Sequence, residues 1–197
     1  MNDLEYLLNQ LNLLIGFLDV SDEQVYHQIK NHDRFNLGIT IEQLYENNFE
    51  NYKNHITTSA LLLGFSHFED FLTKCIVKLL VANPEKNDFK VTLQTIREKG
   101  DSLVLSLAEE QSRRLTFADK IKFFEKNLQG ISTKLITDIR FVNDIRNCLM
   151  HHNGLADVRL ISKYQVGQKI ILNSGEVNGY GLHARQLARE IWDRIEK

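Results

Sequence analysis

Apolar residues recur at helical spacing along most of the chain. In the first twenty residues, leucines lie three or four positions apart, which predicts an amphipathic helix with one apolar stripe. From Thr40 the same spacing continues through a much longer stretch, which ends at Asn83-Pro84 because the residue before a proline disfavours helical geometry. The pattern therefore predicts one short helix and one very long helix in the first half of the chain.

Polar residues suited to helix starts divide the second half of the chain. Thr116 predicts the N-cap of a short helix that stops at Gly130. Ser132 predicts the N-cap of the next helix, for which Asn153-Gly154 is a suitable C-terminal stop.

The C-terminal residues change character. Residues 160–172 are richer in β-branched side chains, and Gly167 lies between two apolar runs, which predicts a small β-hairpin within residues 155–180. Helical spacing returns from Ala184 to Ile195 and predicts a last helix. We therefore expect one all-α domain over residues 1–197, a helical bundle with a small β-hairpin near its C-terminus.

The composition agrees with a helical globular protein. One proline and ten glycines leave few helix breakers, and 43% apolar with 25% charged residues is ordinary for a soluble domain. The net charge of −2 does not support broad electrostatic capture of nucleic acid, but it leaves a small local basic site open. The N-terminal segment carries acids where a signal peptide has basic residues, and no apolar run is long enough to span a bilayer. A cytoplasmic protein without a membrane partner is expected.

The sequence predicts neither a metal nor a cofactor. Cys75 and Cys148 lie inside apolar helical patterns, which favours buried free thiols over a disulfide. No histidines lie at ligand spacing from them. The chain also lacks a glycine-rich phosphate loop, an H-E-x-x-H motif and a G-x-S-x-G motif.

A polar cluster at the end of the penultimate predicted helix carries the candidate chemistry. Arg146, Asn147 and His151 stand in the order R-N-x-x-x-H, and Asn153-Gly154 follow them. This arrangement resembles the signature of the HEPN superfamily, a set of helical-bundle domains common in prokaryotic toxins and defence ribonucleases. Many such sequences continue with asparagine and glycine, as this one does.

A second segment adds to the resemblance. Residues 66–72 match an S-x-x-E-x-x-L pattern that is often found on an earlier helix of these domains. The resemblance therefore covers two helices in the expected order and contributes little after residue 154. It implies a HEPN-type bundle that acts as a homodimeric, metal-independent RNA endonuclease. It further implies a toxin or antiphage effector, with an antitoxin protein as a partner in the former case.

The residue types suit RNA cleavage without a metal. The 2′-hydroxyl of the substrate acts as the nucleophile, and a histidine such as His151 can transfer protons near neutral pH. Arg146 would supply a fixed positive charge beside the phosphorane-like transition state. Asn147 can hold a phosphate oxygen or orient the histidine. The place of His151 near a helix C-terminus suits a general acid for the leaving 5′-oxygen.

Helix geometry constrains this site. Asn147 and His151 are four positions apart and share a face, whereas Arg146 and His151 are separated by about 140° around a regular helix. Two solutions exist: either the helix unwinds near its end, or two protomers each supply part of the site. The family resemblance favours the second, a symmetric dimer with paired motifs facing a shared cleft.

Three neighbours are candidate supporting residues whose roles stay open. His152 can assist His151, contact RNA or only cap the helix. Glu69 can pair with Arg146 or be an ordinary surface acid. Asn153 continues the family pattern. A basic cluster, which is either a track for RNA or a solvated helix face, comprises Arg113, Arg114, Lys120, Lys122 and Lys126.

Two other functions compete with the nuclease. A HEPN-like domain can lose catalysis and remain an RNA- or protein-binding module. The chain can also be a structural helical protein, in which polar residues at a helix end match the motif by chance. RNA products that end in a 2′,3′-cyclic phosphate would distinguish the nuclease from both.

Overall fold

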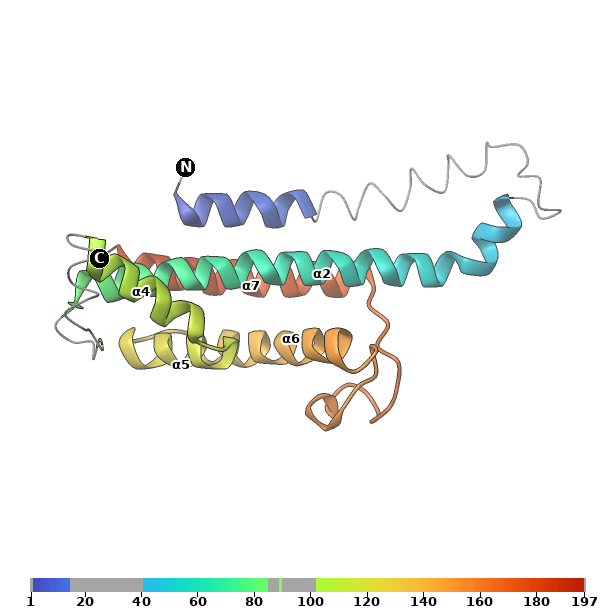
Figure 1. Ribbon diagram of the computed structural model, residues 1–197. Helices are drawn as coiled ribbons and strands as arrows, with labels where there is room; N and C mark the ends of the chain where they lie inside the picture. The colour runs from blue at the N-terminus through green and yellow to red at the C-terminus, as the bar shows by residue number, and fades with distance from the viewer. Residues whose placement is uncertain (1, 15–40, 85–88, 90–101, 197) are drawn as a thin grey trace.

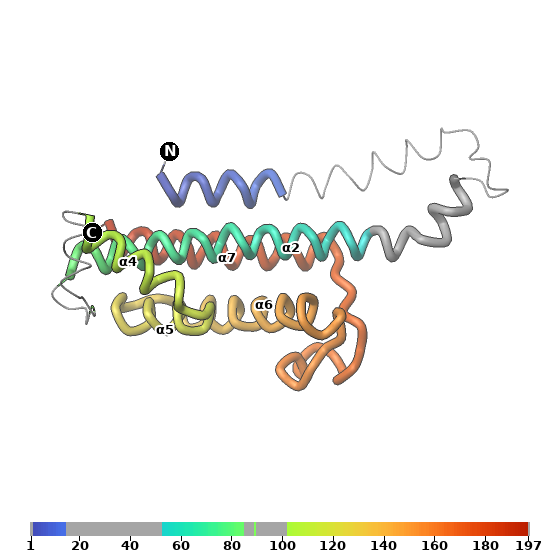
Figure 2. Tube along the Cα trace, viewed as in Figure 1, coloured from blue at the N-terminus to red at the C-terminus, as the bar shows by residue number. Residues whose placement is uncertain are grey.

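The computed structural model shows an elongated all-α bundle and describes residues 2–14, 41–84, 89 and 102–196. The helical segments are residues 3–14, α2 (Ile41–Ala82), α4 (Leu103–Arg114), α5 (Phe117–Asn127), α6 (Thr133–His151), the short 3-10 helix η3 (Val158–Leu160) and α7 (Ser174–Ile195). The long helix α2 forms the axis, α7 packs along it, and α6 runs beside this pair (Figures 1 and 2). The predicted all-α class is confirmed, whereas the later part of the first predicted helix lies outside the described residues.

Helix starts follow the predicted polar caps. Thr116 Oγ1 accepts the backbone N–H of Asp119 at 3.2 Å and starts α5. Ser132 Oγ accepts the backbone N–H of Leu135 at 3.3 Å and starts α6. Each cap satisfies a donor that the first helical turn leaves free, which contributes about 1 kcal/mol. Both predicted helix starts are therefore confirmed.

The hydrophobic core lies where α2, α5, α6 and α7 meet. Burying one large apolar side chain contributes about 1.5–3 kcal/mol, so the apolar faces of these helices hold the bundle together. The largest fully buried side chains include Phe68, Phe71, Phe124, Ile121, Ile139 and Ile145. Cys75 and Cys148 are buried free thiols, as the sequence predicted. The described helices contain no apolar segment of the length that a bilayer span requires.

The predicted β-hairpin within residues 155–180 is wrong. The segment holds a single isolated bridge between Leu155 and Lys169, with turns and η3 between the two residues. Helix α7 begins at Ser174, well before the predicted start at Ala184. This segment, although rich in β-branched residues, therefore forms a folded loop.

Side chains of α2 replace the strand partner that a hairpin would have provided. Asn54 Oδ1 accepts the N–H of Leu172 at 3.2 Å, and Thr57 Oγ1 donates to the Leu172 carbonyl at 2.9 Å. Both main-chain groups of Leu172 are used in this way, so no β-ladder extends through it. Asn173 then starts α7 through a capping box with Glu176, which ends the loop.

Candidate functional site

The motif helix α6 stays regular through His151 and ends in a tight turn. The backbone N–H groups of His152 and Gly154 both donate to the Cys148 carbonyl, at 3.0 and 3.1 Å. Asn153 and Gly154 adopt left-handed φ values of 53° and 73°, a conformation that asparagine and glycine tolerate best. The predicted helix stop at Asn153-Gly154 is confirmed. Asn153 therefore contributes the backbone turn, and His152 is the C-cap residue.

Arg146 is a partly buried cation held by its neighbours. Its Nη1 donates to Asn147 Oδ1 at 3.1 Å, and its guanidinium carbon lies 5.8 Å from the centre of the Phe65 ring. Of the described residues, no carboxylate lies within 4.0 Å of it; Glu69 pairs with Lys120, and Asp144 pairs with Arg159. A fixed guanidinium without an ion-pair partner is suited to bind an anion such as phosphate.

His151 does not join Arg146 within one chain. It is exposed on the last turn of α6, whereas Arg146 packs over Phe65 of α2. Because the helix is regular, the two side chains leave its axis about 140° apart. The unwinding that would have brought them together is absent from this described helix. Asn147 Oδ1 accepts a hydrogen bond from Arg146 and contacts no histidine in the described hydrogen bonds.

Glu69 pairs with a residue that neither of its predicted roles included. Its Oε1 lies 3.0 Å from Lys120 Nζ, and Lys120 is only 5% exposed. The pair joins α2 to α5. Glu69 lies one helical turn from Phe65, whose ring lies under the Arg146 guanidinium. Glu69 is thus neither the partner of Arg146 nor a free surface acid, and Lys120 does not belong to a solvated basic face.

A charged cluster beside the motif was not predicted from the sequence. His152 Nε2 lies 3.9 Å from Asp157 Oδ2, and Asp157 accepts from Arg159 Nε at 3.0 Å. Arg159 also reaches Asp144 of α6, with Nη1 3.5 Å from Oδ1. The only sequence signal was an acid and an arginine two positions apart after the helix stop, a spacing too common to indicate a site.

The local environment shifts the pKa values of three groups in this region. The Arg159 side chain holds the pKa of Asp157 at about 2, and the cluster therefore keeps an ionised carboxylate. Burial raises the pKa of Asp144, against the opposing effect of Arg159. Burial also raises the pKa of the Cys148 thiol, which makes it a poor nucleophile at neutral pH.

We expect Asp157 to stabilise the fold above about pH 4 and to lose this effect as the pH falls toward 2. The pKa of its carboxyl is lowered from 3.8 to about 2 by folding, so protonation at low pH favours the unfolded chain. The urea midpoints of the wild type and Asp157→Asn should differ near neutral pH and converge near pH 2. A difference that stays constant across this range would contradict the assignment.

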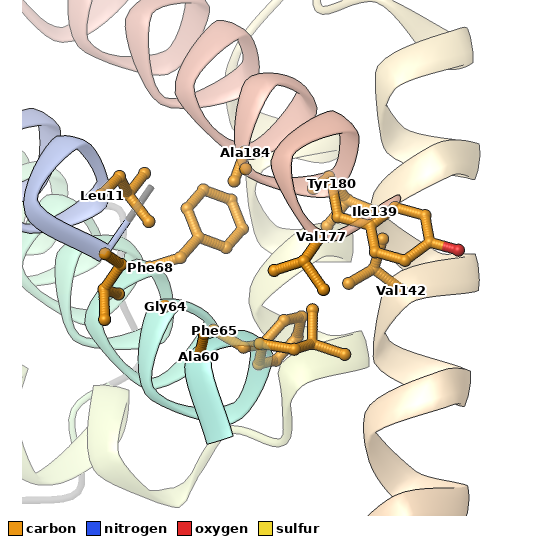
Figure 3. A pocket seen from close by; sticks show the side chains of 13 residues that line it. Leu11, Ala60, Gly64, Phe65, Phe68, Ile139, Val142, Val177, Tyr180 and Ala184 are labelled. Atoms are coloured by element: carbon orange, nitrogen blue, oxygen red, sulfur yellow. The ribbon is translucent and has the colours of Figure 1, made fainter. Parts of the chain in front are cut away.

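An apolar cavity lies behind Phe65, in the bundle interior. Its volume is about 40 Å³, and its walls are formed by the first helix, α2, α6 and α7 (Figure 3). The labelled aliphatic and phenylalanine side chains surround it, whereas the Tyr180 hydroxyl points away from it (Figure 3). An apolar space of about 40 Å³ is too small to hold a nucleotide. It is a packing gap behind the arginine and not the substrate site.

Comparisons with known proteins add no further assignment. No protein-family model, no curated protein and no solved structure matches the chain. In the part of the chain that the structure describes, no group of three or more histidine, cysteine or acidic residues could hold a metal ion. The candidate site therefore rests on the geometry of Arg146, Asn147 and His151.

Proposed function

We propose that the protein is a metal-independent RNA endonuclease of the HEPN type. The observation that carries this proposal is the Arg146 guanidinium, which is fixed by Asn147 and Phe65 and has no carboxylate partner among the described residues. It lies on the same helix as His151, whose side chain is exposed. The all-α bundle and the R-N-x-x-x-H order on its penultimate long helix are consistent with the HEPN resemblance.

The proposed reaction is a transesterification within the RNA chain. The 2′-hydroxyl loses its proton to a general base, its oxygen bonds to the adjacent phosphorus, and the bond from phosphorus to the 5′-oxygen breaks. Arg146 stabilises the negative charge that develops on the phosphoryl oxygens, because it is held in place before the reaction. His151 gives a proton to the leaving 5′-oxygen. The products are a 2′,3′-cyclic phosphate and a 5′-hydroxyl end.

The active unit in this proposal is a homodimer. One regular helix separates Arg146 from His151, so a second protomer is needed to place a histidine beside the arginine. Two copies of α6 related by a twofold axis would form two equivalent composite sites. A nuclease of this kind would act as a toxin or antiphage effector, and a toxin would need an antitoxin protein to restrain it.

A non-catalytic RNA- or protein-binding module is the alternative function. The favouring observation is that Asn147 holds the Arg146 guanidinium, whereas His151 lies apart from both residues in one chain. Such a module would retain RNA on Arg146 without cutting it. It would show RNA retention and no cyclic phosphate product.

Incubation of the protein with mixed tRNA, mRNA and rRNA in EDTA tests the proposal. We expect the wild type to produce fragments with 2′,3′-cyclic phosphate ends, and His151→Ala to be slower by about 10²–10⁴-fold, as for loss of a general acid. Circular dichroism should show that the variant is folded. Cleavage by the wild type that EDTA abolishes, or His151→Ala activity equal to the wild type, would contradict the proposal.

A further inference from the structure

His152 projects from a rigid turn toward a carboxylate. Its backbone N–H donates to the Cys148 carbonyl at 3.0 Å, and its own carbonyl accepts the N–H of Leu155 at 2.9 Å. The imidazole Nε2 lies 3.9 Å from Asp157 Oδ2, and 49% of the side chain is exposed. The backbone of His152 is therefore held by the turn. Its ring lies close to a carboxylate on one side and is exposed on the other.

Asp157 is itself held in place. It is the N-cap of η3 and accepts the backbone N–H of Arg159 at 2.9 Å. The Arg159 Nε donates to both of its carboxylate oxygens, at 3.0 and 3.2 Å. Arg159 also pairs with Asp144 of α6, which ties the whole turn to the motif helix. The carboxylate thus keeps a defined position relative to His152.

The charged side chains of this cluster have a net charge of −1, since both carboxylates share one guanidinium. Asp144 and Asp157 carry two negative charges, and Arg159 carries one positive charge. A proton received by His152 would place a second positive charge within 3.9 Å of Asp157 and neutralise the cluster. The carboxylate of a Ser-His-Asp enzyme stabilises the imidazolium through a hydrogen bond, whereas Asp157 lies 3.9 Å from His152 Nε2, within ion-pair distance of a protonated ring.

We propose that His152, positioned by Asp157 and Arg159, is the general base of the site; this inference rests on the proposed RNA cleavage. His152 takes the proton of the 2′-hydroxyl, and the 2′-oxygen bonds to phosphorus. The bond from phosphorus to the 5′-oxygen breaks, and His151 gives its proton to that oxygen. One proton is taken and one is given, so the reaction needs no other reagent. Asp157 and Arg159 are positioning residues, since they act through His152.

A substrate with sulfur in place of the bridging 5′-oxygen separates the two histidines. A thiolate leaves without a proton, so this substrate bypasses the general acid but still needs the base. On ordinary RNA, we expect both His151→Ala and His152→Ala to be slower by at least about 100-fold. The sulfur substrate should restore the rate of His151→Ala and leave His152→Ala slow. Asp157→Asn should lower kcat by about tenfold or more at unchanged KM, and Asp157→Glu should recover part of it.

The chain offers a matched control in His183 of α7, whose Nδ1 lies 3.7 Å from Asp138 Oδ2. This pair has a similar geometry but lies away from the motif, so His183→Ala should cleave both substrates at the wild-type rate. If the wild type cleaves but His152→Ala is as fast, or the sulfur substrate restores His152→Ala, this inference falls and the nuclease stands. If the wild type leaves both substrates intact, both proposals fall.

Discussion

Mixed dimers that combine one Arg146→Ala chain with one His151→Ala chain are expected to cleave RNA, although neither variant does so alone. Each variant homodimer lacks the same group in both of its sites, which should lower the rate by about 10²–10⁴-fold. In the mixed dimer, one composite site keeps Arg146 from one chain and His151 from the other. The second site lacks both. One of the two sites should therefore regain wild-type activity.

The basis of this expectation is the regularity of α6. The helix is unbroken through His151, so Arg146 and His151 leave it in directions about 140° apart. A site contained in one chain would have needed a distorted last turn. Instead, the Cys148 carbonyl accepts the N–H groups of the two residues that end the turn, His152 and Gly154. Joining the two chemical groups then requires a second chain.

The experiment uses two differently tagged chains that are co-expressed and purified on both tags in succession. Two matched controls are prepared in the same way. In one, both tagged chains carry Arg146→Ala, and in the other, both carry His151→Ala. Mixed dimers as inactive as these controls would show that each site lies within one chain. Size-exclusion chromatography with light scattering checks that all three preparations are dimers.

The helices were predictable because their signals are local. Thr116 and Ser132 each cap a helix through an N–H three positions later, so sequence spacing alone identifies them. The turn at Asn153-Gly154 was also local, since asparagine and glycine tolerate the left-handed conformation found there. The angular separation of Arg146 and His151 followed from helix periodicity in the same way.

The errors concern contacts between residues far apart in the chain. Residues 155–180 have the composition of strands, but Leu172 bonds to Asn54 and Thr57 of α2. Glu69 pairs with Lys120, which lies 51 positions later in the chain. A lysine on a helix is ordinarily a surface residue, and nothing in the spacing of Lys120 marks it as buried. This contact forms only because α5 packs on α2, which the sequence spacing does not indicate.

Glu69→Ala is expected to destabilise the contact between α2 and α5 strongly. It would leave the Lys120 ammonium without its partner, although the lysine side chain is only 7% exposed. Breaking a buried ion pair by removing one partner costs about 3–5 kcal/mol, and the 28% exposure of the Glu69 side chain places this pair near the lower end. Lys120→Met in the Glu69→Ala background should recover most of the loss, because it removes the stranded charge. Urea unfolding measures the free energies of unfolding of the wild type, Glu69→Ala and the double variant.

Asp70→Ala is the matched control, since Asp70 neighbours Glu69 and pairs with Lys74 on the solvent side of α2. An exposed pair of this kind contributes about 0.5 kcal/mol or less. Equal effects of Asp70→Ala and Glu69→Ala would show that the Glu69–Lys120 pair contributes little to stability.

Cleavage provides the second test, because Glu69 contacts Lys120 and not Arg146. Glu69→Ala should therefore retain the wild-type rate at temperatures where it stays folded, whereas a direct role in holding Arg146 would lower that rate without lowering stability.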